Sequence, residues 1–444
     1  MASTERGEAD SQQAGAPVGV ASQPNLDQST AALASSPDLI ADSFGEYARL
    51  WLRRVRSGES GALPVVLGLI VIVAYFQIRN SLFLSAGNLV NLLTQAAWIM
   101  MLGMAQVFVL LLGEIDLSIG YSSAMGATIT CWMLAGANPV PWWVAVLAGL
   151  AFAAAYSGIQ GVLVTWLKLP SFVVTLAGLL AGEGLLLYLI DTAAPSGGGT
   201  IRLNSNVLIN IEGGYMSPVA GWIVMAAAVV LGGLFLVLRD NRRRAGKLAA
   251  PPLSVTLLKV AVMAVAGVVV ELIGNANRGT AFTVLRGVPW VVLLVLVVLI
   301  AWSVLLSRTR FGRYVYAIGG NAEAARRAGI SLSRIRVLAF TLGGLTAGIA
   351  GIIYASNLGS VSNNVNGGQL VLYAVAAAVI GGTSLFGGRG KMLGAVLGGL
   401  IVGVIYNGLY LLGLGAAAIN IWTALVLLAA VTVDTLARRG TTTR

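Results

Sequence analysis

Side chains able to take part in chemistry are few in this sequence, and they lie in separate places. Histidine is absent and Cys131 is the single cysteine. These facts exclude the commonest general base, an intramolecular disulfide and a cysteine cluster for a metal. What remains is an acidic segment, GEIDLSIG (113–120), two glutamates inside apolar runs, Glu183 and Glu271, and a basic segment, GRYVYAIGGNAEAARRAGI (312–330).

The acidic segment lies between two apolar runs, where a carboxylate can serve structure or motion. Asp116 and Ser118 can cap a helix that follows them. A conformational role for the same residues is the open alternative. Glu183 lies within an apolar run, and a charge at the membrane centre costs roughly 2.5–3.5 kcal/mol on insertion scales. We therefore expect Glu183 to face a polar path, with a tolerated structural site as the alternative.

The basic segment predicts a short helix, Ala322 to Ala328, that needs a docking partner. Asn321 can cap its start, Glu323 lies at its positive end, Arg326 and Arg327 at its negative end, and Gly329 at its stop. Isolated helices shorter than about 12–15 residues are marginal in water. A capped helix of this length is therefore expected to dock, the alternative being a basic loop that only sets membrane topology.

No phosphate-binding loop is present to supply energy within this chain. The nearest match to G-x-x-x-x-G-K-[ST] is GGRGKM (387–392), which lacks the first glycine at the right spacing and the final Ser or Thr. The sequence also lacks a run of buried carboxylates and histidines typical of a proton relay. We expect no bound cofactor and no metal, and ATP is not expected to bind here by that route.

Composition places these segments in a polytopic membrane protein with an all-α fold. Of the 444 residues 57% are hydrophobic and 10% are charged, against about 25% charged in a soluble domain. The net charge of +11 comes from basic residues clustered at the ends of apolar runs. That pattern follows the positive-inside rule and argues against nucleic-acid binding.

Hydropathy predicts about twelve transmembrane helices with both termini in the cytoplasm. With an even number of spans, the main basic clusters all lie on the cytoplasmic side of the membrane. Pairs of small residues four apart, such as Gly344 and Gly348, predict close helix packing. The expected spans lie near 63–79, 91–112, 117–135, 142–166, 172–190, 218–238, 255–274, 288–306, 336–356, 369–386, 391–413 and 418–436.

The chain is expected to divide around this membrane domain. Residues 1–44 are predicted to form a disordered cytoplasmic tail, and 45–61 an amphipathic interfacial helix, with a solvated linker as the alternative. The transmembrane domain covers 62–438 and includes an extra helix pair at 218–274 and a cytoplasmic loop at 307–335, before a tail at 439–444.

Four segments resemble one family, the ATP-binding-cassette permeases for simple sugars of the ribose and xylose type. GRYVYAIGGNAEAARRAGI looks like that family's cytoplasmic loop, GEIDLSIG like its G-G-I-D-L-S-x-G segment, and GGTSLFGGRG (381–390) like its G-G-T-S-L-x-G-G-x-G segment. LPSFVVTLAGLLAGEGL (169–185) is similar to its fifth-span region. The shorter ribose-type members have about ten spans. A chain with the extra helix pair therefore resembles the longer xylose-type permeases more than the ribose-type ones.

The resemblance implies an importer without catalytic activity of its own, in the bacterial cytoplasmic (inner) membrane. It implies a second permease copy, a separate sugar ATPase (two domains or one tandem chain), an extracytoplasmic sugar-binding protein and surrounding membrane lipid. The substrate implied is a pentose such as xylose. ATPase coupling would involve Gly320, Asn321, Glu323, Ala324, Arg326, Arg327 and Gly329, and the translocation path Asp116, Ser118, Glu183, Thr383, Ser384 and Asn407.

Two departures from the family pattern weaken the inference, taken from the family, about the translocation path and its substrate. Glu114 follows Gly113 where Gly-Gly is usual, and Glu183-Gly184 replaces a common Arg-Gly. Two other classes stay open. A self-contained secondary transporter or facilitator of small polar solutes is the main alternative. A membrane-embedded transferase is disfavoured because histidine is absent and acidic residues are few near the membrane face.

Overall fold

The computed structural model describes most of the membrane domain. Of the expected interfacial helix, only 45–47 and 49 are described, and they are helical. Both tails, and most of the expected span at 418–436, lie outside the described residues. The described residues are 45–47, 49, 63–135, 139–194, 198–246, 248, 250–280, 282–415, 417, 418, 420–425, 428 and 432.

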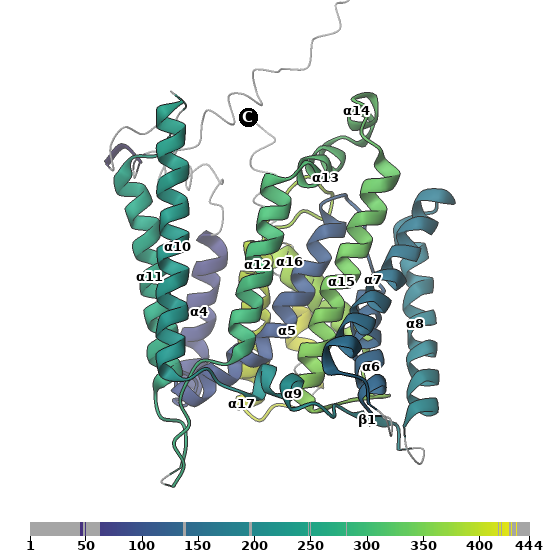
Figure 1. The fold of residues 1–444 in the computed structure, drawn as a ribbon, viewed down its shortest axis with the longest axis horizontal. Helices are drawn as coiled ribbons and strands as arrows, with labels where there is room; N and C mark the ends of the chain where they lie inside the picture. Colours follow the sequence, from purple (N-terminus) through teal and green to yellow (C-terminus); the bar gives the residue numbers. More distant parts are fainter. Residues whose placement is uncertain are drawn as a thin grey trace, which may run out of the picture.

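The predicted all-α architecture is confirmed, and the long helices stand side by side (Figure 1). They are α4 (Leu63–Arg79), α5 (Ala86–Leu110), α6 (Ile119–Ala135), α7 (Trp142–Trp166), α8 (Ser171–Ala193), α10 (Pro218–Ala245), α11 (Leu253–Asn275), α12 (Trp290–Arg308), α15 (Leu332–Leu358), α16 (Gly367–Ile380) and α17 (Met392–Leu411).

Short elements mark the two ends of the bundle. At one end, called the α14 end, lie α13 (Arg310–Gly320) and α14 (Ala322–Arg327). At the other, called the β end, lie α9 (Asn206–Gly213) and the antiparallel pair of β1 (Thr200–Arg202) and β2 (Ser360–Ser362). Figure 1 shows the α14 end at the top and the β end at the bottom.

Eight described helices, α5, α7, α8, α10, α11, α12, α15 and α17, are long and apolar enough to cross a bilayer. Two shorter apolar stretches, Val65–Arg79 and Gly367–Ile380, accompany them. α6 has 17 residues and starts in the interior, because Gly120 meets Gly367 at the first residue of α16. Twelve full spans therefore stay a prediction, since α6 and α16 are short and the last expected span is largely undescribed.

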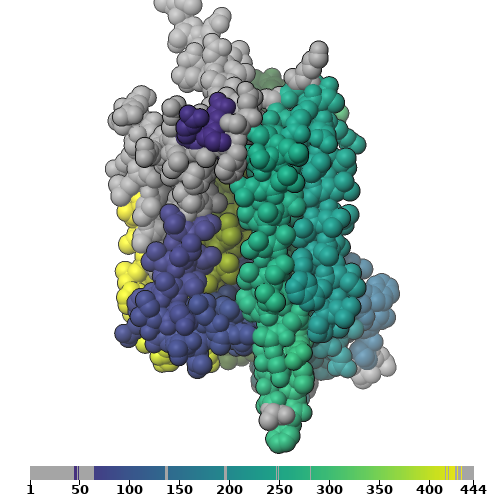
Figure 2. Space-filling model, turned by 90° about the vertical axis from the view of Figure 1, so that its left-hand side faces the viewer, coloured from purple at the N-terminus to yellow at the C-terminus, as the bar shows by residue number. Residues whose placement is uncertain are grey.

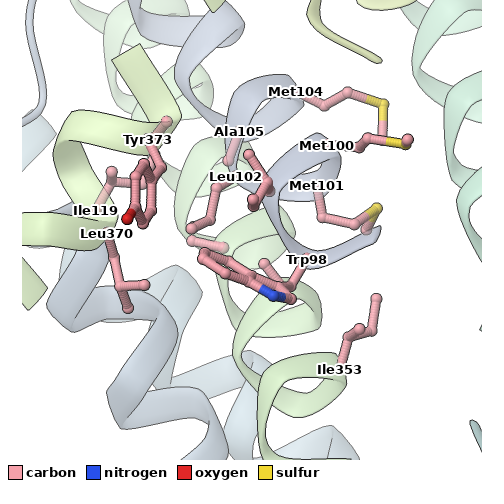
Figure 3. Packing of buried hydrophobic residues seen from close by; sticks show 14 of the residues in the cluster. Trp98, Met100, Met101, Leu102, Met104, Ala105, Ile119, Ile353, Leu370 and Tyr373 are labelled. Atoms are coloured by element: carbon pink, nitrogen blue, oxygen red, sulfur yellow. The ribbon is translucent and has the colours of Figure 1, made fainter. Parts of the chain in front are cut away.

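The core is built around α5, which packs against α15, α16 and α17. Trp98 on α5 makes edge-on contacts with Tyr354 of α15 and Tyr373 of α16, at centroid distances of 5.1 and 5.8 Å. Figure 3 shows Trp98 beneath a column of methionines from the same helix. Burial of this continuous apolar cluster fixes the positions of α5 and its neighbours.

The extra pair expected at 218–274 forms helices α10 and α11, which pack mainly against each other. In Figure 2 they form a teal to green column, and the segment from α11 to α12 projects beyond the rest of the molecule at the bottom of the view. The pair leaves and rejoins the core through a narrow stem. Met216 N donates to Val288 O at 2.9 Å, and Tyr215 bridges antiparallel to Pro289.

Candidate functional site

α14 is a six-residue helix held by its own caps at the end of the bundle. Asn321 Oδ1 accepts a hydrogen bond from Ala324 N at 2.9 Å, which confirms the predicted N-cap. Gly329 adopts φ +80°, and Ile330 N donates to Ala325 O at 3.1 Å, which closes the end of the helix. The helix ends at Arg327 with Ala328 as its C-cap, one residue earlier than expected.

One side of α14 faces the protein and the other is open. Ala325 is buried, whereas Glu323, Ala324, Arg326 and Arg327 are exposed; these four define the α14 face. Glu323 Oε1 lies 2.8 Å from an Arg326 nitrogen and 3.3 Å from Arg327 Nε. The hydrogen bond from Arg326 lowers the pKa of Glu323, so this carboxylate stays ionised near neutral pH. Exposed ion pairs of this kind stabilise a fold very little, so the face stays available to a partner.

The segment expected as a cytoplasmic loop, 307–335, contains a further helix, α13, that was not predicted. Thr309 Oγ1 accepts from Gly312 N at 3.3 Å and caps the helix, whose buried side carries Val315 and Ile318. The Tyr316 hydroxyl donates to Gly390 O at 2.8 Å, and burial raises the pKa of Tyr316. α13 therefore packs against the segment after α16 and carries α14 at its C-terminal end.

The C-terminal end of α13 meets two other chain segments through close backbone contacts at glycines. A Cβ on Gly319 would lie 1.8 Å from Leu111 O and 2.5 Å from Gly388 N, and one on Gly387 would lie 2.8 Å from Gly113 N. Gly388 N donates to Leu111 O at 2.9 Å. Gly113, Gly387 and Gly388 also have positive φ, which favours glycine. We call Gly113, Gly319, Gly387 and Gly388 the glycine junction.

The junction joins the segments that resemble the family motifs, GEIDLSIG and GGTSLFGGRG, to the α13–α14 unit. Its neighbour Glu114 forms an ion pair with Arg336 of α15, 3.1 Å between Oε1 and Nε, and both side chains are mostly buried. Glu114, the departure from Gly-Gly, thus has a specific partner. Sequence reasoning missed this pair, although an unusual charge at a motif position was a usable signal.

Asp116 and Ser118 lie at the start of α6, fully buried in a hydrogen-bonded chain. Asp116 Oδ1 accepts from the backbone and hydroxyl of Ser118 at 2.8 and 2.7 Å. Gln160 of α7 donates to Ser118 Oγ at 2.8 Å. These contacts fit the expected capping role and tie the start of α6 to α7.

The other predicted path residues are dispersed rather than brought together. Thr383 and Ser384 are buried in the turn after α16, where Ser384 Oγ accepts from Phe386 N at 3.2 Å. Asn407 is buried between α17 and α5, accepting from Asn88 at 2.9 Å and donating to Gln95 at 3.0 Å. Glu183 is exposed on α8.

A cavity of about 800 Å³ lies beside the start of α16; its lining is mostly apolar and carries a few amide and hydroxyl side chains. Gln369 Nε2 donates to Tyr373 Oη at 2.9 Å and to Asn420 Oδ1 at 2.7 Å, and Asn366 and Thr423 are the other polar residues of the lining. Its described lining residues include no charged side chain. Sequence reasoning passed over this site, although an amide inside each of two apolar runs was a visible signal.

Comparisons with known proteins agree with the motifs. Residues 88–436 match the family described as "Branched-chain amino acid transport system / permease component". The xylose transport system permease protein of Haemophilus influenzae is 35% identical over 379 residues, covering 84% of this chain and 95% of that protein. The ribose import permease protein of Bacillus subtilis is 32% identical over 378 residues, covering 85% of this chain and 94% of that protein.

The xylose transport system permease protein of Escherichia coli gives a similar match, 34% identical over 378 residues, with 84% of this chain and 92% of that protein covered. No solved structure gives a significant match. The family match spans most of the membrane domain, including the glycine junction, α13 and α14. The chain therefore belongs to this family of ATP-binding-cassette permease components, as a multi-pass membrane transport subunit rather than an enzyme.

Proposed function

We propose that this chain is the permease of an ATP-driven importer for a neutral simple sugar, of the pentose class. The observation that carries the proposal is the α14 face, an exposed charged surface fixed above the glycine junction in a chain without a phosphate-binding loop. A separate ATPase would bind this face. Closure of that ATPase would rock the helices through α13.

The amide and hydroxyl groups of the cavity beside α16, with no charged side chain among its described lining residues, favour a neutral hydroxylated solute over an amino acid. Amide and hydroxyl groups donate and accept hydrogen bonds as sugar hydroxyls require, whereas a zwitterion needs charged partners. Asn366, Gln369 and Asn420 offer amides, and no described lining residue is charged. Relatives named for xylose and ribose transport support the same choice, although the family description names branched-chain amino acids.

The assembly proposed contains two permease copies, an ATPase that docks at the α14 end and a sugar-binding protein at the β end. The membrane would be the bacterial inner membrane, with the α14 end and both termini in the cytoplasm. Basic residues support this orientation, because Arg242, Arg243, Arg308 and Arg313 all lie toward the α14 end.

The coupling group proposed is the α14 face with its flanking residues Gly320, Asn321 and Gly329. For the path, Asn366 and Gln369 join the residues expected from the sequence. Asp116 Oδ2 and Thr383 Oγ1 are buried and have no hydrogen-bond partner among the described residues. Such groups fit a path that is closed here and rearranges during the transport cycle.

The coupling proposal is tested by filling the α14 face. The Ala324→Trp variant should abolish ATP-driven uptake in proteoliposomes that contain the ATPase and the binding protein, because the new indole blocks docking. Val219→Trp, on an exposed side chain of α10 at the β end, is the matched control and should transport normally. Normal ATPase association and uptake by Ala324→Trp would show that α14 does not dock.

A second measurement separates the importer from the facilitator and the sugar from the amino acid. Uptake of labelled xylose, ribose and leucine is compared with and without ATP, in the full assembly and with the permease alone. The proposal expects uptake of a pentose, only with ATP and only in the assembly. Sugar uptake by the permease alone would establish the facilitator, and ATP-driven leucine uptake would establish the amino-acid importer.

A further inference from the structure

The α10–α11 pair leaves a groove against the core at the α14 end. α10 is held to α11 by close contacts, such as Gly233 against Val260, and its packing with α12 is slight. Between α10 and α12 lies a cavity of about 760 Å³. A smaller one of about 380 Å³ adjoins it and shares Phe235, Arg239, Arg243 and Arg308.

The groove is basic at its rim and apolar along its length. Four arginines, Arg239, Arg242, Arg243 and Arg308, line the two cavities. The nearby carboxylate, Asp240, is already engaged by Arg239 at 2.8 Å and by Thr256 at 2.7 Å. Among the described residues, neither Arg243 nor Arg308 forms an ion pair with a carboxylate, so the rim carries uncompensated positive charge.

The apolar part runs from this rim toward the membrane interior. Leu299, Ile300 and Val304 of α12 face Phe235 of α10, and the guanidinium of Arg308 stands 5.3 Å from the centroid of the Phe235 ring. The arginines occupy the last turns of two spans, which is the depth of lipid headgroups. The groove therefore pairs anion recognition with a hydrocarbon-binding wall.

We propose that this groove binds one anionic phospholipid, with its phosphate at Arg243 and Arg308 and its acyl chains along Leu299, Ile300 and Val304. Basic pockets between transmembrane helices on the cytoplasmic side bind such headgroups. A free phosphate would use the rim but would leave the apolar wall unfilled. The lipid fills the space that side chains leave between α10 and α12, and so attaches the helix pair to the core.

The test uses the full-length chain, purified in mild detergent and stripped of lipid. Native mass spectrometry and thermal unfolding are recorded with dioleoyl-phosphatidylglycerol, dioleoyl-phosphatidylcholine or inorganic phosphate. The variants are the double change Arg243→Gln/Arg308→Gln and the control Arg313→Gln, an exposed arginine of α13 outside the groove. A third variant, Ile300→Trp, fills the apolar wall and leaves the charge unchanged.

The proposal expects retention of phosphatidylglycerol, but not phosphatidylcholine, by the unmodified chain and by Arg313→Gln. Retention should fall at least fivefold in the double variant and in Ile300→Trp. Equal retention by the double variant would overturn the proposal. Displacement of the lipid by millimolar phosphate, with full binding by Ile300→Trp, would show a free-anion site and would also overturn it.

Discussion

The α5-centred core and the α10–α11 pair contain similar apolar helices but are packed in opposite ways. In α5, 89% of the most apolar 18-residue stretch is buried, against 11% in both α10 and α11. Their glycines differ as well. A Cβ on Gly351 of α15 would lie 1.9 Å from Ser123 O, whereas one on Gly232 of α10 would meet only the end of the Met263 side chain.

This difference indicates that the α5-centred core determines the fold, whereas the α10–α11 pair is an addition to it. In the core, backbones touch, so each helix fixes the position of its neighbours. In the pair, flexible side chains fill the contact and can adjust. The narrow stem at Met216 and Val288 carries both connections. We therefore expect substitutions in the core to alter folding and coupling, and changes in the pair to be tolerated.

The largest effect is expected from adding one methyl group to the core. Gly351→Ala should destabilise the protein by about 3 kcal/mol, because backbone atoms of α6 and α15 must separate. Gly232→Ala should change stability by less than about 0.5 kcal/mol, since the Met263 methyl can move. Thermal unfolding in detergent measures both. Equal shifts of the melting temperature for the two variants would show that the core and the pair do not differ in packing.

The glycine junction can be compared with a glycine of α4 that has open surroundings. Gly319→Ala should reduce ATP-driven uptake at least about tenfold, equivalent to about 1.4 kcal/mol, because its Cβ would collide with Leu111 O. At Gly68 of α4 a Cβ would meet nothing within 4 Å, so Gly68→Ala is the control and should retain uptake. Both variants are assayed in proteoliposomes after a check of folding. Full uptake by Gly319→Ala would contradict a tight junction.

A pH dependence is expected where α9 docks on the core. Glu212 is buried beside α15, where its backbone N donates to Ser356 Oγ at 3.2 Å. Burial raises the pKa of Glu212 from 4.5 to about 8. Between these values the folded state keeps a proton that the unfolded state releases, so the free energy of unfolding falls as pH rises from 5 to 8.

The slope from Glu212 should be at most about 1.4 kcal/mol per pH unit. Glu212→Gln removes the titration and should flatten the dependence of the melting temperature over this range. Asp191, a carboxylate at the end of α8, is exposed, so Asp191→Asn is the control and should keep the slope. A slope that survives Glu212→Gln would assign the pH dependence to another group.

The smallest effect is expected from removing the whole pair. Residues 217–287 would be replaced by Asn-Gly, a two-residue turn suited to the antiparallel backbones of Met216 and Val288. The remaining chain should melt within about 4 °C of the full protein, because the core loses few close contacts. Failure of the shortened chain to insert and fold would show that the pair helps to build the core.

Much of the membrane domain could be predicted from the sequence, because helix length and apolar composition leave little choice in a bilayer. The ends of α7 were predicted to the residue, and the Asn321 cap was predicted from its residue type. α13 was missed because its buried residues, Gly312, Val315 and Ile318, are too few to stand out within a basic segment.

The site could be predicted only in part, because a sequence shows which residues are polar but not which come together. Asp116 and Asn407 were placed on the path, yet their described contacts are buried and link helices. The Gln369–Asn420 contact joins residues 51 apart in sequence. The Glu114–Arg336 pair spans an even longer separation, and only packing could reveal either contact.

The glycine junction also determines how motion can pass through the molecule. A contact made by long side chains can absorb a small displacement, because the rotamers can change before the backbones move. Gly319, Gly387 and Gly113 have no side chains to rotate, and their backbones already touch. Any tilt of α13 must therefore displace the end of α5 and the segment after α16 together. The junction thus transmits movement between these segments rigidly.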